Sequence, residues 1–239
     1  MKNAGVTPKK EDMKLSRLLI AGLWLLVFCF PTPALAKEKE KPGAVKWFKF
    51  DEENALKEWT EKIFRGRVFY SLEHAKEDGF VHALSQDAAS GLYYKMRFSP
   101  SKLPMISWKW KVRKFPEVSA NEPNKDVSRM DDFAARIYLV FPSGSFGSSR
   151  CLEYIWDERL PRETIVDSPW GKNIKLIVVR TGADRDMWYK EERNIYEDFK
   201  KAFGYYTKLD VGAVAFMTDT DDTRDTAEAY YDEIKLGYK

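Results

Sequence analysis

The feature that most constrains the fold is a succession of short apolar segments, rich in β-branched and aromatic residues, that runs along most of the chain. They are VKWFKF (45–50), RVFYSLEH (67–74), GFVHALS (79–85), GLYYKMRF (91–98), PMISWKWKVRKF (104–115), FAARIYLVF (133–141), CLEYIW (151–156), NIKLIVV (173–179), VGAVAFMT (211–218) and AEAYYDEIKL (227–236). Turn-forming residues separate most of them, so each is predicted to be a strand. The series predicts a mainly all-β fold, an antiparallel β-sandwich or jelly roll.

One segment has a helical period instead. In EERNIYEDFKKAFG (191–204) the apolar residues Ile195, Phe199 and Phe203 recur every four positions, which predicts one amphipathic helix near residues 190–203. Acidic residues at its start and basic residues near its end complement the helix dipole, and Gly204 suits a C-cap. The helix is expected to pack over an end or edge of the sandwich.

The N-terminus has the pattern of a secretory leader. Lys14 and Arg17 precede an uncharged run at residues 18–30, and the small-residue pattern Ala-Leu-Ala follows at 34–36. This predicts a signal peptide over residues 1–36 and a mature chain that begins at Lys37. The run is at the short end for a bilayer span, and Pro31 and Pro33 interrupt its continuation, so an uncleaved anchor is the weaker alternative.

The rest of the chain is predicted to form one domain. Residues 37–43, KEKEKPG, read as a charged linker, and residues 44–239 contain no second linker and no repeat. The first twelve residues do not resemble a leader, so Met13 is an alternative start to Met1. We expect a periplasmic or secreted monomer, without a membrane span in its mature form.

Charge and cysteine content argue against a nucleic-acid-binding protein and against a disulfide-stabilised one. Removing residues 1–36 takes away five of the 40 basic and two of the 37 acidic side chains, which leaves 35 of each. A neutral mature chain without a clustered basic stripe is not expected to bind nucleic acid. Cys151 is the one cysteine beyond the leader, so no intramolecular disulfide is expected, and a domain of this length can bury a core without one.

The segment DDFAARIYLVF (131–141) places polar side chains within an apolar strand. Strand alternation puts Phe133, Ala135, Ile137, Leu139 and Phe141 on one side and Asp132, Ala134, Arg136, Tyr138 and Val140 on the other. Asp132 and Arg136 are then about 13 Å apart, at about 3.3 Å per residue, which is too far for them to pair with each other. Each needs a partner on another strand, in solvent or in a ligand.

The preceding segment SWKWKV (107–112) alternates in the same way, with Trp108 and Trp110 on one side and Lys109 and Lys111 on the other. We expect the tryptophans in the core, and the strand beside 131–141, with both charged sides on one sheet surface. That surface is either a solvated face, with ion pairs contributing up to about 1 kcal/mol each, or a polar groove with small Ala134 as its floor.

Several motifs together are similar to the bacterial domain-of-unknown-function family DUF3047. These are WKWKV (108–112), DDFAARIYLVF (131–141), EYIW (153–156), ERN (192–194) with Asp198 and FG (203–204), and MTDTDDT (217–223), in that order. The likeness covers roughly Val68 to Leu236. It implies a secreted protein with a galactose-binding-like jelly roll, and it implies no established activity.

The loop TDTDDT places Asp219, Asp221 and Asp222 after an apolar strand. Alternate oxygen ligands suit calcium, although the glycine and distal glutamate of an EF-hand are missing. A capped, solvated turn is the favoured interpretation, a calcium site or a sugar-hydroxyl site is the alternative, and no other cofactor is expected. Among the tryptophans, Trp156 and Trp170 lie at or near loops and are the better candidates for a platform that stacks on a sugar ring.

The sequence does not match most known catalytic motifs. His74 and His82 lack metal-ligand spacing, and PSGSFGSS (142–149) lacks the order of a nucleophile elbow. A carboxylate pair remains as a hypothesis, in which Asp131 or Asp132 acts with Glu192 or Asp219 in glycoside cleavage, provided that the oxygens lie about 5 to 10 Å apart.

These observations favour a non-catalytic protein that binds a carbohydrate or another hydroxyl-rich ligand of the cell envelope. The expected ligand-binding residues are Lys109, Lys111, Asp132, Arg136 and Tyr138, with Arg180 and Asp219 at the margins. The alternative is a glycosidase or lyase that acts on an anionic polysaccharide in the same groove. A third class, an envelope assembly protein that recognises another protein, also fits.

Overall fold

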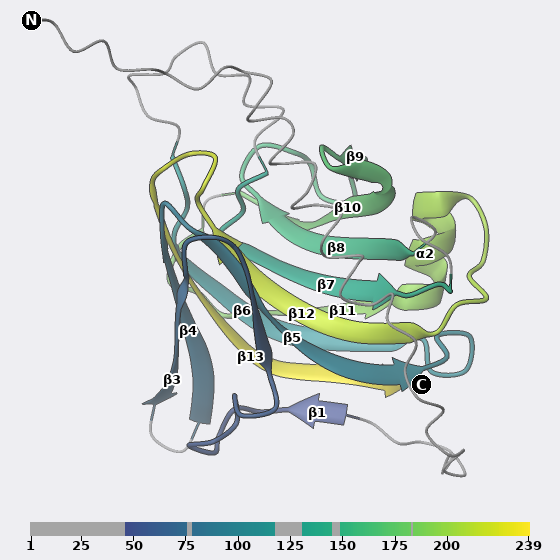
Figure 1. Cartoon of the computed structure of the whole chain (residues 1–239), viewed down its shortest axis with the longest axis horizontal. Helices are drawn as coiled ribbons and strands as arrows, with labels where there is room; N and C mark the ends of the chain where they lie inside the picture. The colour runs from purple at the N-terminus through teal and green to yellow at the C-terminus, as the bar shows by residue number, and fades with distance from the viewer. Residues whose placement is uncertain (1–45, 76–77, 118–130, 145–148, 183) are drawn as a thin grey trace, which may run out of the picture.

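The computed structural model is a sandwich of two β-sheets (Figure 1), and it describes residues 46–75, 78–117, 131–144, 149–182 and 184–239. The expected leader and linker, residues 1–43, lie outside the described residues.

The smaller sheet has six strands and the larger sheet has seven. The smaller sheet runs in the order β11 (Tyr189–Asn194), β6 (Met105–Lys114), β13 (Thr226–Tyr238), β4 (Asp78–Gln86) and β3 (Phe69–Ala75), and β1 (Lys46–Phe48) also pairs with β13. The larger sheet runs in the order β2 (Thr60–Arg65), β5 (Ala89–Phe98), β12 (Val211–Asp219), β7 (Ala135–Phe141), β8 (Arg150–Asp157), β10 (Gly171–Thr181) and β9 (Ile165–Ser168).

Successive strands cross repeatedly between the two sheets. From β4 to β7 the chain alternates at every step, and β11, β12 and β13 alternate again. The strands pair antiparallel in both sheets, except that β10 runs parallel to β8. The predicted mainly all-β jelly-roll sandwich is therefore confirmed.

Three strands, β2, β9 and β11, were not predicted, and all three lie at the end of a strand order. The sequence of β2 is TEKIFR and that of β11 is YKEERN, so charged residues replace the apolar alternation. An edge strand has one unpaired side and is commonly charged, which weakens the sequence signal.

The predicted helix exists but is shorter than expected. Helix α2 spans Ile195–Phe203, and residues 189–194 form β11 instead, so Glu191 and Glu192 are not at its N-terminus. The helix begins at Asn194, whose side chain accepts hydrogen bonds from two backbone N–H groups, and it ends at Gly204 in the left-handed conformation. Neither α2 nor any other helix among the described residues is long and apolar enough to cross a membrane.

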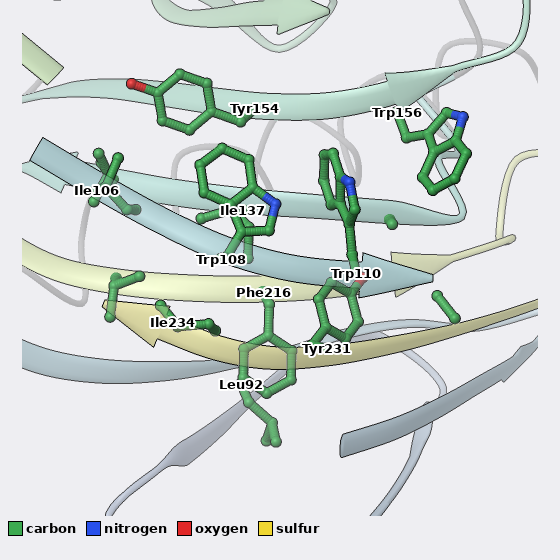
Figure 2. Close-up of a cluster of buried hydrophobic side chains, with 14 of the residues drawn as sticks. Leu92, Ile106, Trp108, Trp110, Ile137, Tyr154, Trp156, Phe216, Tyr231 and Ile234 are labelled. Atoms are coloured by element: carbon green, nitrogen blue, oxygen red, sulfur yellow. The ribbon is translucent and has the colours of Figure 1, made fainter. Parts of the chain in front are cut away.

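The core lies between the sheets and is rich in aromatic side chains (Figure 2). Trp108 and Trp110 on β6 are fully buried, as predicted, and Trp108 stacks on Tyr154 of β8 with ring centroids 5.2 Å apart. Trp156 belongs to the same core, where its ring lies 5.9 Å from that of Trp110. The expectation that Trp156 forms an exposed platform is therefore wrong.

The expected pairing of SWKWKV with 131–141 is also wrong. Strand β6 lies in the smaller sheet and β7 in the larger one, so their apolar sides face each other across the core. Their polar sides consequently point to opposite outer faces of the sandwich. The groove floor expected at Ala134 is also absent, because Ala134 packs in the core between the sheets.

The backbone at Gly79 crosses very close to the backbone of Phe50 and Asp51, and this crossing provides a test of the packing. A Cβ atom at Gly79 would lie 2.7 Å from Cα of Asp51 and would also overlap the carbonyl oxygen of Phe50. We expect Gly79→Ala to lower the free energy of unfolding by about 1 to 3 kcal/mol in urea denaturation, because rigid backbone must shift. Gly144→Ala is the control, since its Cβ meets no atom within 4 Å. Equal stability of the two variants would contradict the crossing.

Candidate ligand-binding site on the outer face of the larger sheet

Arg136 is the centre of a buried polar cluster on the face of the larger sheet that points away from the core. Its side chain is 1 % exposed. Its Nη1 lies 3.4 Å from Oδ2 of Asp131 and 3.7 Å from Oε2 of Glu153. Its Nη2 donates to the backbone oxygen of Asp131 at 2.5 Å and pairs with Oδ2 of Asp219. One guanidinium therefore contacts three carboxyl groups.

Three adjacent strands bring these groups together. Arg136 on β7 pairs in register with Met217 of β12, and Asp219 stands two residues further along β12. Glu153 on β8 lies opposite Tyr138 of β7, so all these side chains point to the same face. Because β12, β7 and β8 are central strands of the larger sheet, the cluster is built on rigid elements.

Burial changes the protonation of the carboxyl groups. It raises the pKa of Glu153 to about 8, and the nearby charge of Asp131 adds to this effect while Arg136 opposes it. Burial also raises the pKa of Asp131 and that of Asp219, and in both cases the Arg136 charge acts in the opposite direction. Glu153 is therefore mainly protonated at neutral pH and can donate a hydrogen bond.

Three buried polar atoms in this cluster have no hydrogen-bond partner among the residues that the structure describes. They are Nε of Arg136, Oδ1 of Asp131 and Oε2 of Glu153. An unsatisfied buried polar atom costs about 1 to 3 kcal/mol, so most proteins pair such atoms or hold water or ligand there. Arg136 Nε is a hydrogen-bond donor, the oxygens of Asp131 and Glu153 can accept, and all three atoms lie on the outer face of the larger sheet.

Trp170 provides an aromatic side chain beside the cluster. It lies in the connection between β9 and β10 and is half-buried. Its indole Nε1 donates to Oδ2 of Asp131 at 2.6 Å, and its ring packs against the apolar side chains of the outer face. Of the two tryptophans singled out in the sequence as platform candidates, Trp170 is thus the one that the structure places at the polar cluster.

Four of the expected ligand-binding residues lie together on this face or at its edge, namely Asp132, Arg136, Tyr138 and Asp219. Asp132 does not pair with Arg136, as predicted from their spacing. It accepts hydrogen bonds from the backbone N–H groups of Asp222 and Thr223 instead, at 3.2 and 2.5 Å. Asp132 therefore fastens the start of β7 to the loop after β12.

The other three expected residues lie elsewhere, which corrects the predicted single groove. Lys109 is on the outer face of the smaller sheet, where its Nζ lies 3.1 Å from Glu233. Lys111, on the same face, lies 4.1 Å from the ring centroid of Tyr230. Arg180 joins the two sheets at their edge through Glu191, with Nε and Oε1 2.6 Å apart. Lys109 and Lys111 are separated from the cluster because β6 and β7 belong to different sheets, whereas Arg180 follows a register shift on β10 of the larger sheet.

Calcium, an alternative interpretation of the acidic loop, would be held by Asp132, Asp219 and Asp221 rather than by Asp219, Asp221 and Asp222. Asp132, Asp219 and Asp221 can bring one oxygen each within 4.8 Å of one another, whereas Asp222 accepts from the backbone N–H of Asp131. Both oxygens of Asp132 accept backbone hydrogen bonds, and those of Asp219 accept from Phe133 N and Arg136. These oxygens are thus engaged by the protein's own donors, next to a guanidinium that repels a cation.

The structure also shows which carboxylates of the proposed catalytic pairs lie near one another. Glu192 lies on β11 of the smaller sheet and accepts from the Tyr238 hydroxyl at 2.8 Å, so pairs that include Glu192 are wrong. Asp131 and Asp219 meet at Arg136. Glu153 was missed by the sequence reasoning, although a single carboxylate inside the apolar segment CLEYIW is a usable signal.

The chain belongs to the DUF3047 family, proteins of unknown function, whose model matches residues 57–235. No curated protein matches the chain. Among solved structures, it is similar to a family 11 carbohydrate-binding module from Clostridium thermocellum in complex with a β-1,3-1,4-mixed-linked tetrasaccharide. That match has 13 % identity and a TM-score of 0.40, and covers 83 % of this chain and 98 % of the module.

Two further solved structures are similar at the same level. The xylan-binding domain CBM22-1 of Xyn10C from Paenibacillus barcinonensis has 12 % identity and a TM-score of 0.39, over 84 % of this chain and 98 % of that domain. The endoglucanase Cel12A from Rhodothermus marinus has 9 % identity and a TM-score of 0.41, over 82 % of this chain and 97 % of the enzyme. A fold does not determine a function, which depends on the residues of the site itself.

Proposed function

We propose that this protein binds a carbohydrate or another polyhydroxylated ligand of the cell envelope on the outer face of the larger sheet. The observation that carries the proposal is the group of three buried polar atoms, on Asp131, Arg136 and Glu153, that have no hydrogen-bond partner among the described residues. The leader-like residues 1–36 support a periplasmic or secreted location, where such ligands occur.

The chemistry of the cluster matches sugar hydroxyl groups. A hydroxyl group donates one hydrogen bond and accepts others, so it can satisfy a donor such as Arg136 Nε and an acceptor such as Asp131 Oδ1 at the same time. Protonated Glu153 supplies a further donor. The indole of Trp170, fixed by its hydrogen bond to Asp131, adds the flat apolar surface on which sugar rings stack.

Trp170 is the residue to change first, because it is half-buried and its loss leaves the charges of the cluster in place. We expect Trp170→Ala to weaken binding of glycans selected on an array by about tenfold, equivalent to about 1.4 kcal/mol. Trp170→Phe, which keeps a ring, should retain most of the affinity. Binding is measured by titration calorimetry of the wild type and each variant.

Trp47→Ala is the matched control, since Trp47 is exposed on β1 of the smaller sheet. It should bind glycans as the wild type does. The proposal fails if no glycan or polyol binds to the wild type, or if Trp170→Ala and Trp47→Ala bind equally well.

One observation favours an enzyme as the second candidate function. A protonated carboxyl, Glu153, beside the carboxyl groups of Asp131 and Asp219 is the arrangement that acid–base cleavage of a glycosidic bond uses. Glu153→Gln separates the two functions, because glutamine keeps a hydrogen-bond donor but cannot transfer a proton. A binding protein should retain its affinity in this variant. An enzyme should instead cleave the bound glycan about 100-fold or more slowly.

A further inference from the structure

A second candidate surface lies on the outer face of the smaller sheet, opposite the face that carries the Arg136 cluster. Lys111, one of the ligand-binding residues expected from the sequence, points to this face and has no part in that cluster. Its Nζ lies 4.1 Å from the ring centroid of Tyr230, 5.3 Å from that of Trp188 and 6.0 Å from that of Phe80. We call the surface formed by Phe80, Lys111, Trp188 and Tyr230 the aromatic platform.

Trp188 is fixed by its neighbours although it is 38 % exposed. Its ring centroid lies 5.6 Å from that of Phe80 and 6.3 Å from that of Tyr230, with interplanar angles of 66° and 64°. Edge-to-face contacts of this kind, together with the Lys111 ammonium, hold the indole in one orientation. A ligand that packs on Trp188 therefore meets a ring that is already ordered, which lowers the entropic cost of binding.

Hydrogen-bonding side chains lie beside these rings. His82 stacks on Tyr230 with centroids 4.8 Å apart, and its Nδ1 lies 2.8 Å from Oε1 of Glu73. Arg113 lies 5.0 Å from the Tyr230 centroid, and its Nε lies 3.0 Å from Oδ1 of Asp186. The side chains of Glu73, Arg113 and Asp186 are each about half exposed, so both donors and acceptors are open to a ligand.

The charges around the platform favour an uncharged ligand. Three carboxylates flank it, those of Glu73, Asp186 and Glu228, and its cations are Lys111 and Arg113. The described residues here thus give no positive excess that would attract an anion. Lys111 already places an ammonium group against the rings, where it would repel a cationic ligand.

The platform is longer than one sugar ring. Lys111 pairs in register with Tyr230, and Tyr230 pairs with His82, while Trp188 directly precedes Tyr189, the partner of Trp110 on β6. These side chains form a row across β11, β6, β13 and β4. Three steps between neighbouring strands give a length of about 14 Å, at about 4.8 Å per step.

From this combination we infer that the aromatic platform is a second glycan-binding site, for an uncharged oligosaccharide that packs one ring on Trp188. Its hydroxyl groups contact Glu73, Arg113 and Asp186, because a hydroxyl group can both donate to a carboxylate and accept from a guanidinium. The site lies on the opposite face of the sandwich from the Arg136 cluster and does not depend on the function proposed for that cluster.

The test uses the full chain and five probes, namely the uncharged cellohexaose, xylohexaose and mannohexaose, the anionic hexagalacturonate, and glucose. Binding is followed by calorimetry and by NMR shifts of the backbone amides of Phe80 and Lys111 and of the Trp188 indole. We expect at least one uncharged hexasaccharide to shift these signals and to bind at least about tenfold more tightly than hexagalacturonate and glucose. Its affinity should change little with added salt.

Trp188→Ala should weaken this binding by about tenfold, whereas Trp188→Phe, which keeps a ring, should retain most of the affinity. Trp47→Ala is the matched control, because Trp47 is 47 % exposed on the same sheet and also lies beneath lysine side chains. Trp47 pairs with Lys235 near the C-terminal end of β13, away from the platform. Trp170→Ala should leave the shifts at the platform unchanged.

Three results would overturn the inference. They are the absence of shifts at the platform with all three uncharged hexasaccharides, equal effects of Trp188→Ala and Trp47→Ala, and hexagalacturonate binding as tight as that of the best uncharged probe. The Trp170 indole signal separates this inference from the proposed function. A glycan that shifts only this signal would support the Arg136 cluster and contradict the platform, whereas shifts at the platform alone would count against the proposed function.

Discussion

We expect Arg136→Ala to lower the free energy of unfolding by about 3 to 5 kcal/mol, because it leaves carboxyl groups buried without their guanidinium partner. Arg136 is almost completely buried and contacts Asp131, Glu153 and Asp219. Protonation of these carboxyl groups relieves part of the penalty at low pH. Urea denaturation at neutral pH measures the full effect.

Arg97→Ala is the control for this prediction. Arg97 also pairs with an aspartate, Asp210, at 2.8 Å, but its side chain is 82 % exposed. Removing an exposed ion pair costs about 0 to 1 kcal/mol. If Arg136→Ala were no more destabilising than Arg97→Ala, the guanidinium could not be the buried counter-charge of the cluster.

The second large effect is a dependence of stability on pH that originates from Glu153. The folded protein keeps the Glu153 proton up to a pKa of about 8, whereas the ordinary value is 4.5. Between these values the folded state binds the extra proton, so this contribution to stability is fully present below about pH 4.5 and is lost as the pH rises towards 8. Where the folded state holds this proton and the unfolded state does not, the free energy of unfolding falls by about 1.4 kcal/mol for each pH unit.

Glu153→Gln isolates this contribution, because glutamine does not titrate. Asp221 and Asp232, whose pKa values are raised by burial to about 6 and about 7, change stability in the same direction and remain in the variant. We therefore expect the stability of Glu153→Gln relative to wild type to increase steadily from pH 5 to pH 8 in urea denaturation. A constant difference across this range would show that Glu153 titrates normally.

The central strands and the core could be predicted from the sequence because both depend on local patterns. Trp108 and Trp110 alternate with lysines, and this period of two identifies the buried side of β6 without knowledge of its neighbours. The edge strand β11 could not be predicted, because its charged residues give no such alternation. Its residues were assigned to the helix, whose true start is marked by the cap at Asn194.

The site could be predicted only in part, because its assembly depends on which sheet each strand enters. The alternation of β7 identifies Arg136 and Tyr138 as sharing a face, and that is a local property. Whether Lys109 shares the face depends on strand order, which the sequence does not encode locally. Glu153 has a local signal as a single carboxylate in an apolar segment, but its closeness to Arg136 follows from the register between β7 and β8 and could not be predicted.

The position of Trp170 has a consequence for how such a site can change in evolution. The indole belongs to the short connection between β9 and β10, whereas the charged residues belong to the paired strands β7, β8 and β12 or lie directly beside them. Substitutions or length changes in that connection would move or replace the ring without altering the strand pairing that holds Arg136. Under the proposed function, the residue that contacts a sugar ring can therefore diversify separately from the residues that carry charge, so that different ligands could be bound on an unchanged scaffold.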